Sequence, residues 1–389
     1  DMSNEAVEYV RGIPVVKTFG QTVFSFKRFK ASIDNYGKWV IAYTKQLRLP
    51  MLFYTAAINS VFAFLIAGAL FFTRDGVTDE FLLNLLFYII ITPVISVTLT
   101  KIMFQSENAM IVDDALKRID SVLNAEPLPE PNVSEQPQEY SVELKNVTYS
   151  YDGEKNALED ISLRIEAGQT VAFVGPSGGG KTTLANVIAR FFDPQRGTVS
   201  IGGINVRRIA KEELMDTVSF VFQNSRLIKA SVLENVRLGR PDATRDEVMQ
   251  ALEAAQCMDI VEKLPNGVDT VIGAKGVYLS GGEQQRLAIA RTMLKDAPIV
   301  ILDEATAFAD ADNENRVQAA FSALSRGKTV IMIAHRLSTI VNADRIFVLK
   351  DGKIAESGSF AQLEKNDGLF SEMWRNYQTS IRWKVAKEA

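Results

Sequence analysis

The stretch Val171-Ala-Phe-Val-Gly-Pro-Ser-Gly-Gly-Gly-Lys-Thr-Thr-Leu184 sets the architecture of the C-terminal part of this chain. An apolar run ends in a loop that contains four glycines, and helix-compatible residues follow. Such a loop lets backbone N–H groups converge on an anion at the positive end of a helix. Lys181 is placed to reach the outer phosphates, and Thr182 offers a hydroxyl to Mg²⁺. The pattern predicts a strand, a phosphate-binding loop and a helix.

The whole loop is expected to take part in this binding. A glycine-rich turn that binds nothing is the alternative, but the complete G-x-x-x-x-G-K-T pattern after an apolar strand opposes it. The residues expected to surround the phosphates are Gly175, Pro176, Ser177, Gly178, Gly179, Gly180, Lys181, Thr182 and Thr183.

A second apolar run, Ile299-Val-Ile-Leu-Asp-Glu304, ends in two carboxylates. In open α/β sheets, ligands bind at the carboxyl ends of the strands. Asp303 is suited to hold Mg²⁺ directly or through water, and Glu304 to orient and deprotonate an attacking water. A strand end followed by an acidic helix cap would also give this pattern, but the phosphate loop in the same domain favours the catalytic interpretation.

The segment Leu279-Ser-Gly-Gly-Glu-Gln284 precedes a helical pattern. Ser280, Gly281 and Gly282 at a helix start form a second anion-binding end. One chain thus has two phosphate-binding surfaces far apart in the sequence. This arrangement favours two domains that meet head to tail and sandwich each nucleotide between them.

Length and composition limit the protein class. A chain of 389 residues is too long for one ordinary domain, so two or three units are expected. The net charge of −4 gives no support for a nucleic-acid partner. The single cysteine, Cys257, excludes an intrachain disulfide and a cysteine-rich metal site.

Two uncharged runs, residues 51–72 and 81–99, are long enough to cross a membrane. At 1.5 Å per residue the first gives about 33 Å of helix, against a hydrocarbon core of about 30 Å. Two buried helices of a soluble core are the alternative, but core helices seldom stay uncharged on every face for this length. Pro93 is expected to kink the second helix, and the amphipathic pattern that follows predicts its continuation to residue 124.

Basic residues predict the orientation of these two spans. They flank the pair on both outer sides, whereas the connecting loop has one arginine against three acidic residues. The positive-inside rule places both flanks in the cytoplasm. We therefore expect a multi-pass protein of the inner (plasma) membrane with a cytoplasmic nucleotide-binding domain. The flanking residues are Lys38, Lys45, Arg48, Lys101, Lys117 and Arg118.

The predicted domains follow from these patterns. Residues 1–124 form a partial transmembrane domain, and residues 125–139, with four prolines and four acidic residues, form an extended linker. Residues 140–380 alternate short apolar strands with amphipathic helices, which is typical of an α/β domain. Residues 381–389 are left as a C-terminal tail.

In combination these motifs resemble ABC transporters of the exporter fold, in which a permease is fused to its ATPase. The resemblance covers essentially the whole chain, as the C-terminal portion of a half-transporter. It implies the last two helices of the permease, with four more upstream, followed by an α/β P-loop NTPase domain with a helical subdomain. The implied ligands are ATP and Mg²⁺. The implied partners are membrane lipid and a second half-transporter, and a homodimer and a heterodimer stay equally open.

The resemblance also implies roles for single residues. Tyr151, in the sequence VTYSYDG, would stack on the adenine. Gln223, in FVFQN, would sense Mg²⁺ and the attacking water and couple them to the permease. Asp310 would cross the dimer interface, and His335, the only histidine in the chain, would contact the γ-phosphate. Ser280, Gly281 and Gly282 would contact the γ-phosphate held by the opposite protomer.

The remaining segments fit the same family with some departures. Residues 8–17 resemble the second cytoplasmic loop of such permeases, whose coupling helix docks on the partner's ATPase domain. The interface loop, residues 305–310, reads Ala-Thr-Ala-Phe-Ala-Asp, which resembles half-transporters that import ferric siderophores. Glu283 stands where relatives more often have glutamine, a change expected to be mild.

The expected function is ATP-driven transport by alternating access, with hydrolysis in a head-to-tail dimer. Lys181, Gln223, Glu304 and His335 would surround the γ-phosphate. The cargo is either an exported lipid, peptide or drug-like molecule or an imported ferric siderophore. An ATP-gated channel or regulatory subunit that does not pump is the alternative, and intact Glu304 argues against it. A soluble ATPase acting on DNA or ribosomes is opposed by the two uncharged spans.

Overall fold

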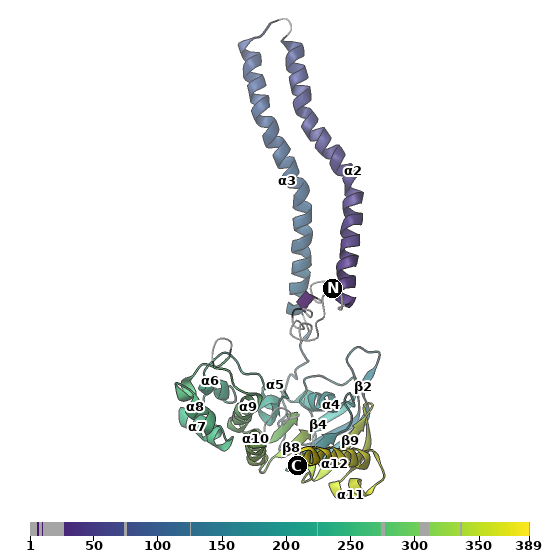
Figure 1. Ribbon diagram of the computed structural model, residues 1–389, viewed down its shortest axis with the longest axis vertical. Coiled ribbons are helices and arrows are strands. Elements are labelled where there is room, and N and C mark those ends of the chain that lie inside the picture. The colour runs from purple at the N-terminus through teal and green to yellow at the C-terminus, as the bar shows by residue number, and fades with distance from the viewer. Residues whose placement is uncertain are drawn as a thin grey trace. The chain divides into compact units, whose positions relative to one another are not determined.

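The computed structural model describes residues 6–7, 10, 27–73, 76–124, 126–223, 225–273, 277–303, 311–334 and 337–388. The chain divides into two compact units, Asp1–Glu126 and Pro127–Ala389. Figure 1 shows both, and each is described by itself.

The first unit contains the long helices α2 (Lys27–Phe72) and α3 (Asp79–Leu123). The Thr78 hydroxyl caps α3 by accepting a hydrogen bond from the N–H of Phe81 at 3.2 Å. Both helices are long and apolar enough to cross a membrane, and only 0% and 6% of their most apolar windows are buried. Such exposure is not that of core helices in a soluble protein, whose apolar faces are covered.

The second unit is built on two β-sheets within its described residues. One is antiparallel with the order β2-β1-β4-β5, and the other has the order β10-β9-β3-β8-β7-β6. The first sheet consists of β1 (Val142–Ser150), β2 (Asn156–Ile165), β4 (Arg196–Ile201) and β5 (Ile204–Asn205). The second consists of β3 (Thr170–Val174), β6 (Val218–Val221), β7 (Ile299–Asp303), β8 (Thr329–Ile333), β9 (Arg345–Lys350) and β10 (Lys353–Gly358).

Strands β3, β8, β7 and β6 of the second sheet run parallel. Phe173 pairs with Ile333, and Ile333 with Asp303, so three of these strands end in register. The carboxyl ends of β3, β6, β7 and β8 therefore meet at one edge of the sheet, where ligands of open α/β sheets bind. These four strands are the ones that precede the predicted nucleotide-binding motifs.

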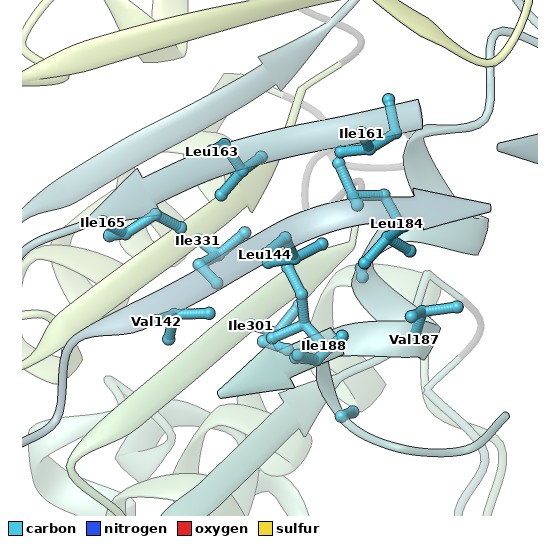
Figure 2. Close-up of a cluster of buried hydrophobic side chains, with 14 of the residues drawn as sticks. Val142, Leu144, Ile161, Leu163, Ile165, Leu184, Val187, Ile188, Ile301 and Ile331 are labelled. Atoms are coloured by element: carbon cyan, nitrogen blue, oxygen red, sulfur yellow. The ribbon is translucent and has the colours of Figure 1, made fainter. Parts of the chain in front are cut away.

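Helix α4 (Lys181–Ile188) follows the glycine-rich loop and is buried between the two sheets. Figure 2 shows Leu184 and Ile188 of α4 among side chains of both sheets, with Leu144 from one and Ile301 from the other. All four side chains are fully buried, with exposures of 0% to 1%. Burial of each stabilises the fold by about 1.5–3 kcal/mol. The two sheets thus hold the helix that begins at the phosphate loop.

A helical subdomain packs on the parallel sheet, and the apolar core that they share includes side chains of β6, β7 and β8. Capping boxes fix the starts of three of its helices, with the pairs Ser231 and Glu234, Thr244 and Glu247, and Ser280 and Glu283. The helices are α6 (Val232–Arg237), α7 (Arg245–Ala254), α8 (Met258–Lys263), α9 (Gly281–Lys295) and α10 (Ala311–Leu324).

The C-terminal helices α11 (Phe360–Lys365) and α12 (Leu369–Glu388) pack against β3 and β9 in a third apolar cluster. Phe360 contacts both Phe370 and Trp374 edge to face. Helix α12 continues through residues 381–388, the segment that the sequence pattern left as a tail.

The proline-rich segment 127–139 packs on the second unit without forming a helix or strand. The buried guanidinium of Arg190, just beyond α4, donates to the carbonyl of Pro129. Glu213, on helix α5 (Lys211–Thr217), accepts hydrogen bonds from the Ser134 hydroxyl and the Gln136 amide. These bonds lower the pKa of the Glu213 carboxyl. These hydrogen bonds hold the segment against the rest of the second unit.

Candidate nucleotide-binding site

The glycine-rich loop has a backbone that side chains larger than hydrogen would disrupt. Gly175 has φ of 141°, and a Cβ there would lie 2.0 Å from the carbonyl oxygen of Leu349. Gly180 has φ of 99°, and its Cβ would lie 2.8 Å from the carbonyl oxygen of Ala157. Both positions therefore require glycine for conformation and for space. The loop wraps tightly between β9 and the start of β2.

Lys181 begins α4 and is buried, with 5% exposure. Its ammonium donates to the carbonyls of Gly175 and Pro176, each at 2.9 Å. The loop thereby closes on its own lysine. Gly180, the N-cap of α4, has no side chain with which to cap the first turn. The first N–H groups of α4 are therefore suited to an anion.

A cavity of about 440 Å³ opens over this loop. Tyr151 lines it, 59% exposed, and its hydroxyl is hydrogen-bonded to that of Thr183 at 3.1 Å. Tyr149 and Phe192 contact the Tyr151 ring edge to face and hold it beside the loop. An exposed aromatic ring next to a phosphate site suits a planar base. The lining residues are Tyr151, Ala157, Ser177, Gly178, Gly179, Gly180, Lys181, Thr182, Thr183 and Gln223.

The predicted metal ligands approach the same edge of the sheet. Asp303 is the last residue of β7 and is buried, with 5% exposure, while Gln223 follows β6. Gln223 lines the cavity over the loop together with Thr182, and it also lines a neighbouring cavity together with Asp303. Each of the three side chains carries an oxygen of a kind that binds Mg²⁺. Among the described residues, no three or more His, Cys, Asp or Glu side chains are grouped so that they could hold a metal ion.

The neighbouring cavity, of about 670 Å³, lies between β6 and helix α9. Its wall includes Arg226, Arg291 and Lys295. Burial lowers the pKa of Arg291 and of Lys295, although Asp216 opposes the effect on the lysine. This larger cavity shares Gln223 with the cavity over the phosphate loop.

The second predicted phosphate-binding surface lies at the start of α9. Ser280 is its N-cap, and the hydroxyl accepts a hydrogen bond from the N–H of Glu283 at 3.3 Å. The Glu283 carboxylate accepts from the N–H of Ser280 at 2.8 Å and from the hydroxyl at 2.9 Å. Ser280 and Gly281 are exposed, so the surface faces outward from its own unit.

Several predicted residues fall outside the described part of the chain. They are Glu304, Asp310 and His335, together with the interface loop 305–310 and most of the coupling segment 8–17. The structure does describe the strands that precede two of them, because β7 ends at Asp303 and β8 ends at Ile333.

Sequence reasoning missed the structural role of Glu283. The sequence predicts only that glutamate in place of glutamine has a mild effect at this position. In the structure Glu283 forms a capping box with Ser280. The spacing Ser-x-x-Glu before a helical pattern is the signal that predicts such a box. No comparable local signal marks Arg190 as the residue that holds the linker.

The family model described as "ABC transporter" matches residues 158–307. This chain belongs to the ABC transporter family. Its fold is that of an exporter-type member, with two apolar helices joined to a nucleotide-binding domain. A solved structure of a bacterial Atm1-family ABC exporter with ATP bound superposes with a TM-score of 0.73 at 31% identity. That superposition covers 96% of this chain and 65% of the exporter.

Curated members of the family align along most of this ABC transporter chain. The mycobactin import ATP-binding/permease protein IrtA of Mycolicibacterium smegmatis is 37% identical over 97% of this chain and 44% of its own length. The ATP-dependent lipid A-core flippase of Desulfotalea psychrophila is 34% identical over 96% of this chain and 65% of its own length. The beta-(1→2)glucan export protein NdvA of Bradyrhizobium diazoefficiens is 47% identical over 60% of this chain and 39% of its own length. The chain thus spans between about two fifths and two thirds of these relatives.

Proposed function

We propose that this chain is the C-terminal portion of a half-transporter that couples ATP hydrolysis to the movement of cargo across a membrane. One observation carries the proposal. A single nucleotide-binding unit has an anion-binding loop at α4 and a second, outward-facing helix start at α9, and it follows two membrane-length helices in the same chain. The relatives named for import, export and lipid flipping support transport as the function that these parts serve.

The phosphate chemistry follows from the residues around the loop. The loop amides and Lys181 would hold the β- and γ-phosphates of ATP, with the Tyr151 ring against the adenine. Thr182, Gln223 and Asp303 would hold Mg²⁺, which neutralises charge on the phosphates when bound. Glu304 would accept a proton from the attacking water, and His335 would contact the γ-phosphate.

The second phosphate surface requires a partner. Ser280 and Gly281 are exposed, so together with Gly282 they would serve the nucleotide of a second half-transporter. Asp310 would lie at the interface between the two. The partner is a second copy of this chain or a related half-transporter. Closure of the dimer on two ATP·Mg²⁺ would exclude water from both sites. It would also drive the membrane helices to their alternative arrangement.

The cavity of about 670 Å³ beside Gln223 is our candidate site for coupling to the partner's membrane domain. We place the partner's coupling segment, residues 8–17, in this cavity. The position of Gln223 on the walls of both cavities supports the placement, because one side chain then contacts the nucleotide site and the docked segment. The two helices would span the inner membrane with the nucleotide-binding domain in the cytoplasm, as the basic flanks favour.

Two classes of cargo have specific support. The flippase and glucan exporter among the relatives support export of a lipid-like or other exported molecule. The mycobactin import protein aligns with 97% of this chain and supports import, and with it a ferric siderophore as cargo.

The test is the ATPase activity of the full-length protein in lipid vesicles, alone and with candidate cargoes that include ferric siderophores and lipids. We expect basal hydrolysis that one cargo class stimulates, together with ATP-dependent uptake or extrusion of that cargo in one direction. Hydrolysis that no movement of cargo accompanies, combined with ATP-dependent ion conductance, would replace the pump by a gated channel. Absence of hydrolysis in the full-length dimer would remove the ATPase assignment.

A further inference from the structure

One carboxylate joins three helices of the helical subdomain. Asp259, on α8, forms a bidentate ion pair with Arg286 of α9, with N–O distances of 2.7 and 3.2 Å. Its Oδ2 also lies 2.9 Å from the guanidinium of Arg316 on α10. Arg286 in addition donates to the carbonyl of Gln256. Asp259 therefore bridges two arginines that come from different helices.

The three side chains differ in exposure. Arg286 is fully buried, with 1% of its side chain exposed, Asp259 is one quarter exposed, and Arg316 is 44% exposed. Burial alone would raise the pKa of Asp259, but Arg286 and then Arg316 outweigh that effect and hold the pKa below its ordinary value. The carboxylate thus stays charged and satisfies a guanidinium that has little access to water. Loss of one partner of such a buried pair is costly, because the other charge is left without its counter-ion.

The two arginines connect Asp259 to two helices that adjoin predicted site residues. Helix α9 begins at the exposed Ser280, and Arg286 lies six residues further on, about 9 Å along the helix axis at 1.5 Å per residue. Helix α10 begins at Ala311, directly after the chain segment that contains Glu304 and Asp310. The two helices also pack against each other. Asp259 therefore fixes the helix that presents the second phosphate surface against the helix that follows the catalytic carboxylate.

We propose that Asp259 is a positioning residue for ATP hydrolysis, which holds the start of α9 where it meets the nucleotide of the partner. The inference rests on the proposed function, because it requires the head-to-tail sandwich. No contact with phosphate or with the attacking water is assigned to Asp259. It acts through Arg286 and Arg316, which keep α9 and α10 in one fixed arrangement when the two protomers close.

The experiment compares Asp259→Asn, Asp259→Glu and Arg316→Gln in the full-length protein in lipid. Asp269→Asn is the matched control, because Asp269 pairs bidentately with Arg245 in the same subdomain, at 2.9 and 2.6 Å, and both partners are 53% exposed. Steady-state hydrolysis gives kcat and KM for ATP, and the melting temperature is measured with and without ATP. Arg316→Gln guards against misfolding, because it releases only the exposed end of the bridge and leaves Arg286 paired.

We expect Asp259→Asn to lower kcat about tenfold or more and Arg316→Gln to lower it about threefold. The reason is that small misplacements of the groups around the nucleotide slow the reaction. Asp259→Glu should restore at least half of the activity, and Asp269→Asn should stay within twofold of the wild type. The ATP-dependent rise in melting temperature should persist in every variant, since the phosphate loop is untouched. Equal kcat in Arg316→Gln and the wild type would overturn the inference, as would equal losses in Asp259→Asn and Asp269→Asn. Absence of hydrolysis in the wild type would instead refute the proposed function.

Discussion

The two helix starts that the sequence assigns to phosphate, those of α4 and α9, differ in what satisfies their first turn. Helix α4 begins at Gly180, which offers no side-chain cap, and at Lys181, which is buried within its own loop. Helix α9 begins at an exposed Ser280 in a complete capping box with Glu283. The N-cap of α4 thus makes no side-chain hydrogen bond to the first turn, whereas the N-cap hydroxyl of α9 accepts from the N–H of Glu283.

This difference indicates which of the two surfaces is suited to bind a nucleotide without a partner. The α4 loop lies in a cavity whose walls come from one unit, so it is suited to bind a nucleotide before any partner arrives. The start of α9 is preorganised by its own cap and exposed, which suits a surface that a nucleotide held elsewhere approaches. Substitutions at the two starts should therefore affect different steps of one cycle.

The largest effect is expected at Glu304, the proposed general base. Glu304→Gln should lower hydrolysis by about 10²- to 10⁴-fold, because water activation is lost while the groups that bind ATP persist. The variant should accumulate as a closed dimer with ATP bound, measured as retained nucleotide after gel filtration. Undiminished turnover would remove Glu304 from its role as the base.

Lys181→Ala tests the α4 side of the comparison. A charge-assisted hydrogen bond to phosphate is worth about 1.5–3 kcal/mol, so affinity for ATP should fall roughly ten- to a hundredfold. The rise in melting temperature on adding ATP should shrink accordingly, because that shift depends on ligand concentration relative to Kd. An unchanged shift would contradict the phosphate-loop assignment.

Ser280→Ala tests the α9 side, with Ser359→Ala as its control. Ser359 caps α11 in the same kind of box with Gln362 and lies outside the proposed site. Each substitution should destabilise its unit by about 1 kcal/mol through loss of a cap. Only Ser280→Ala should also lower kcat, by about tenfold, with binding of ATP at the loop retained. Equal kinetics in the two variants would reduce Ser280 to a helix cap.

The smallest effect is expected for Glu283→Gln. Glutamine also completes a capping box, so stability should change by less than about 0.5 kcal/mol. The substitution removes one negative charge beside the surface that approaches the γ-phosphate. KM for ATP should therefore fall about twofold at low ionic strength, and the difference should vanish in high salt. A KM that rises would show that the carboxylate does not oppose the nucleotide.

Local patterns predicted the fold class, which is confirmed by the family and the superposed exporter. The loop at Gly175 is specified by neighbours in sequence, and an apolar strand ending at Asp303 is readable without any tertiary contact. The roles of Tyr151, Gln223 and Glu304 stay predictions. Contacts between distant segments leave no such local signal. Neither the ion pairs of Asp259 nor the hydrogen bond from Arg190 to Pro129 follows from a periodic pattern or from a motif.

Mixed dimers test the central claim most directly, that each ATP lies between the α4 loop of one protomer and the α9 start of the other. Dimers of the full-length chain are purified through two different tags, and ATP hydrolysis is measured. In one dimer Lys181→Ala and Gly281→Asp are on opposite protomers, and in the other both are on the same protomer.

The head-to-tail sandwich predicts that the first dimer retains one intact site and hydrolyses ATP, whereas the second has two damaged sites and is inactive. Activity in the second dimer and none in the first would contradict the account, because the loop and the α9 start of one chain would then act together.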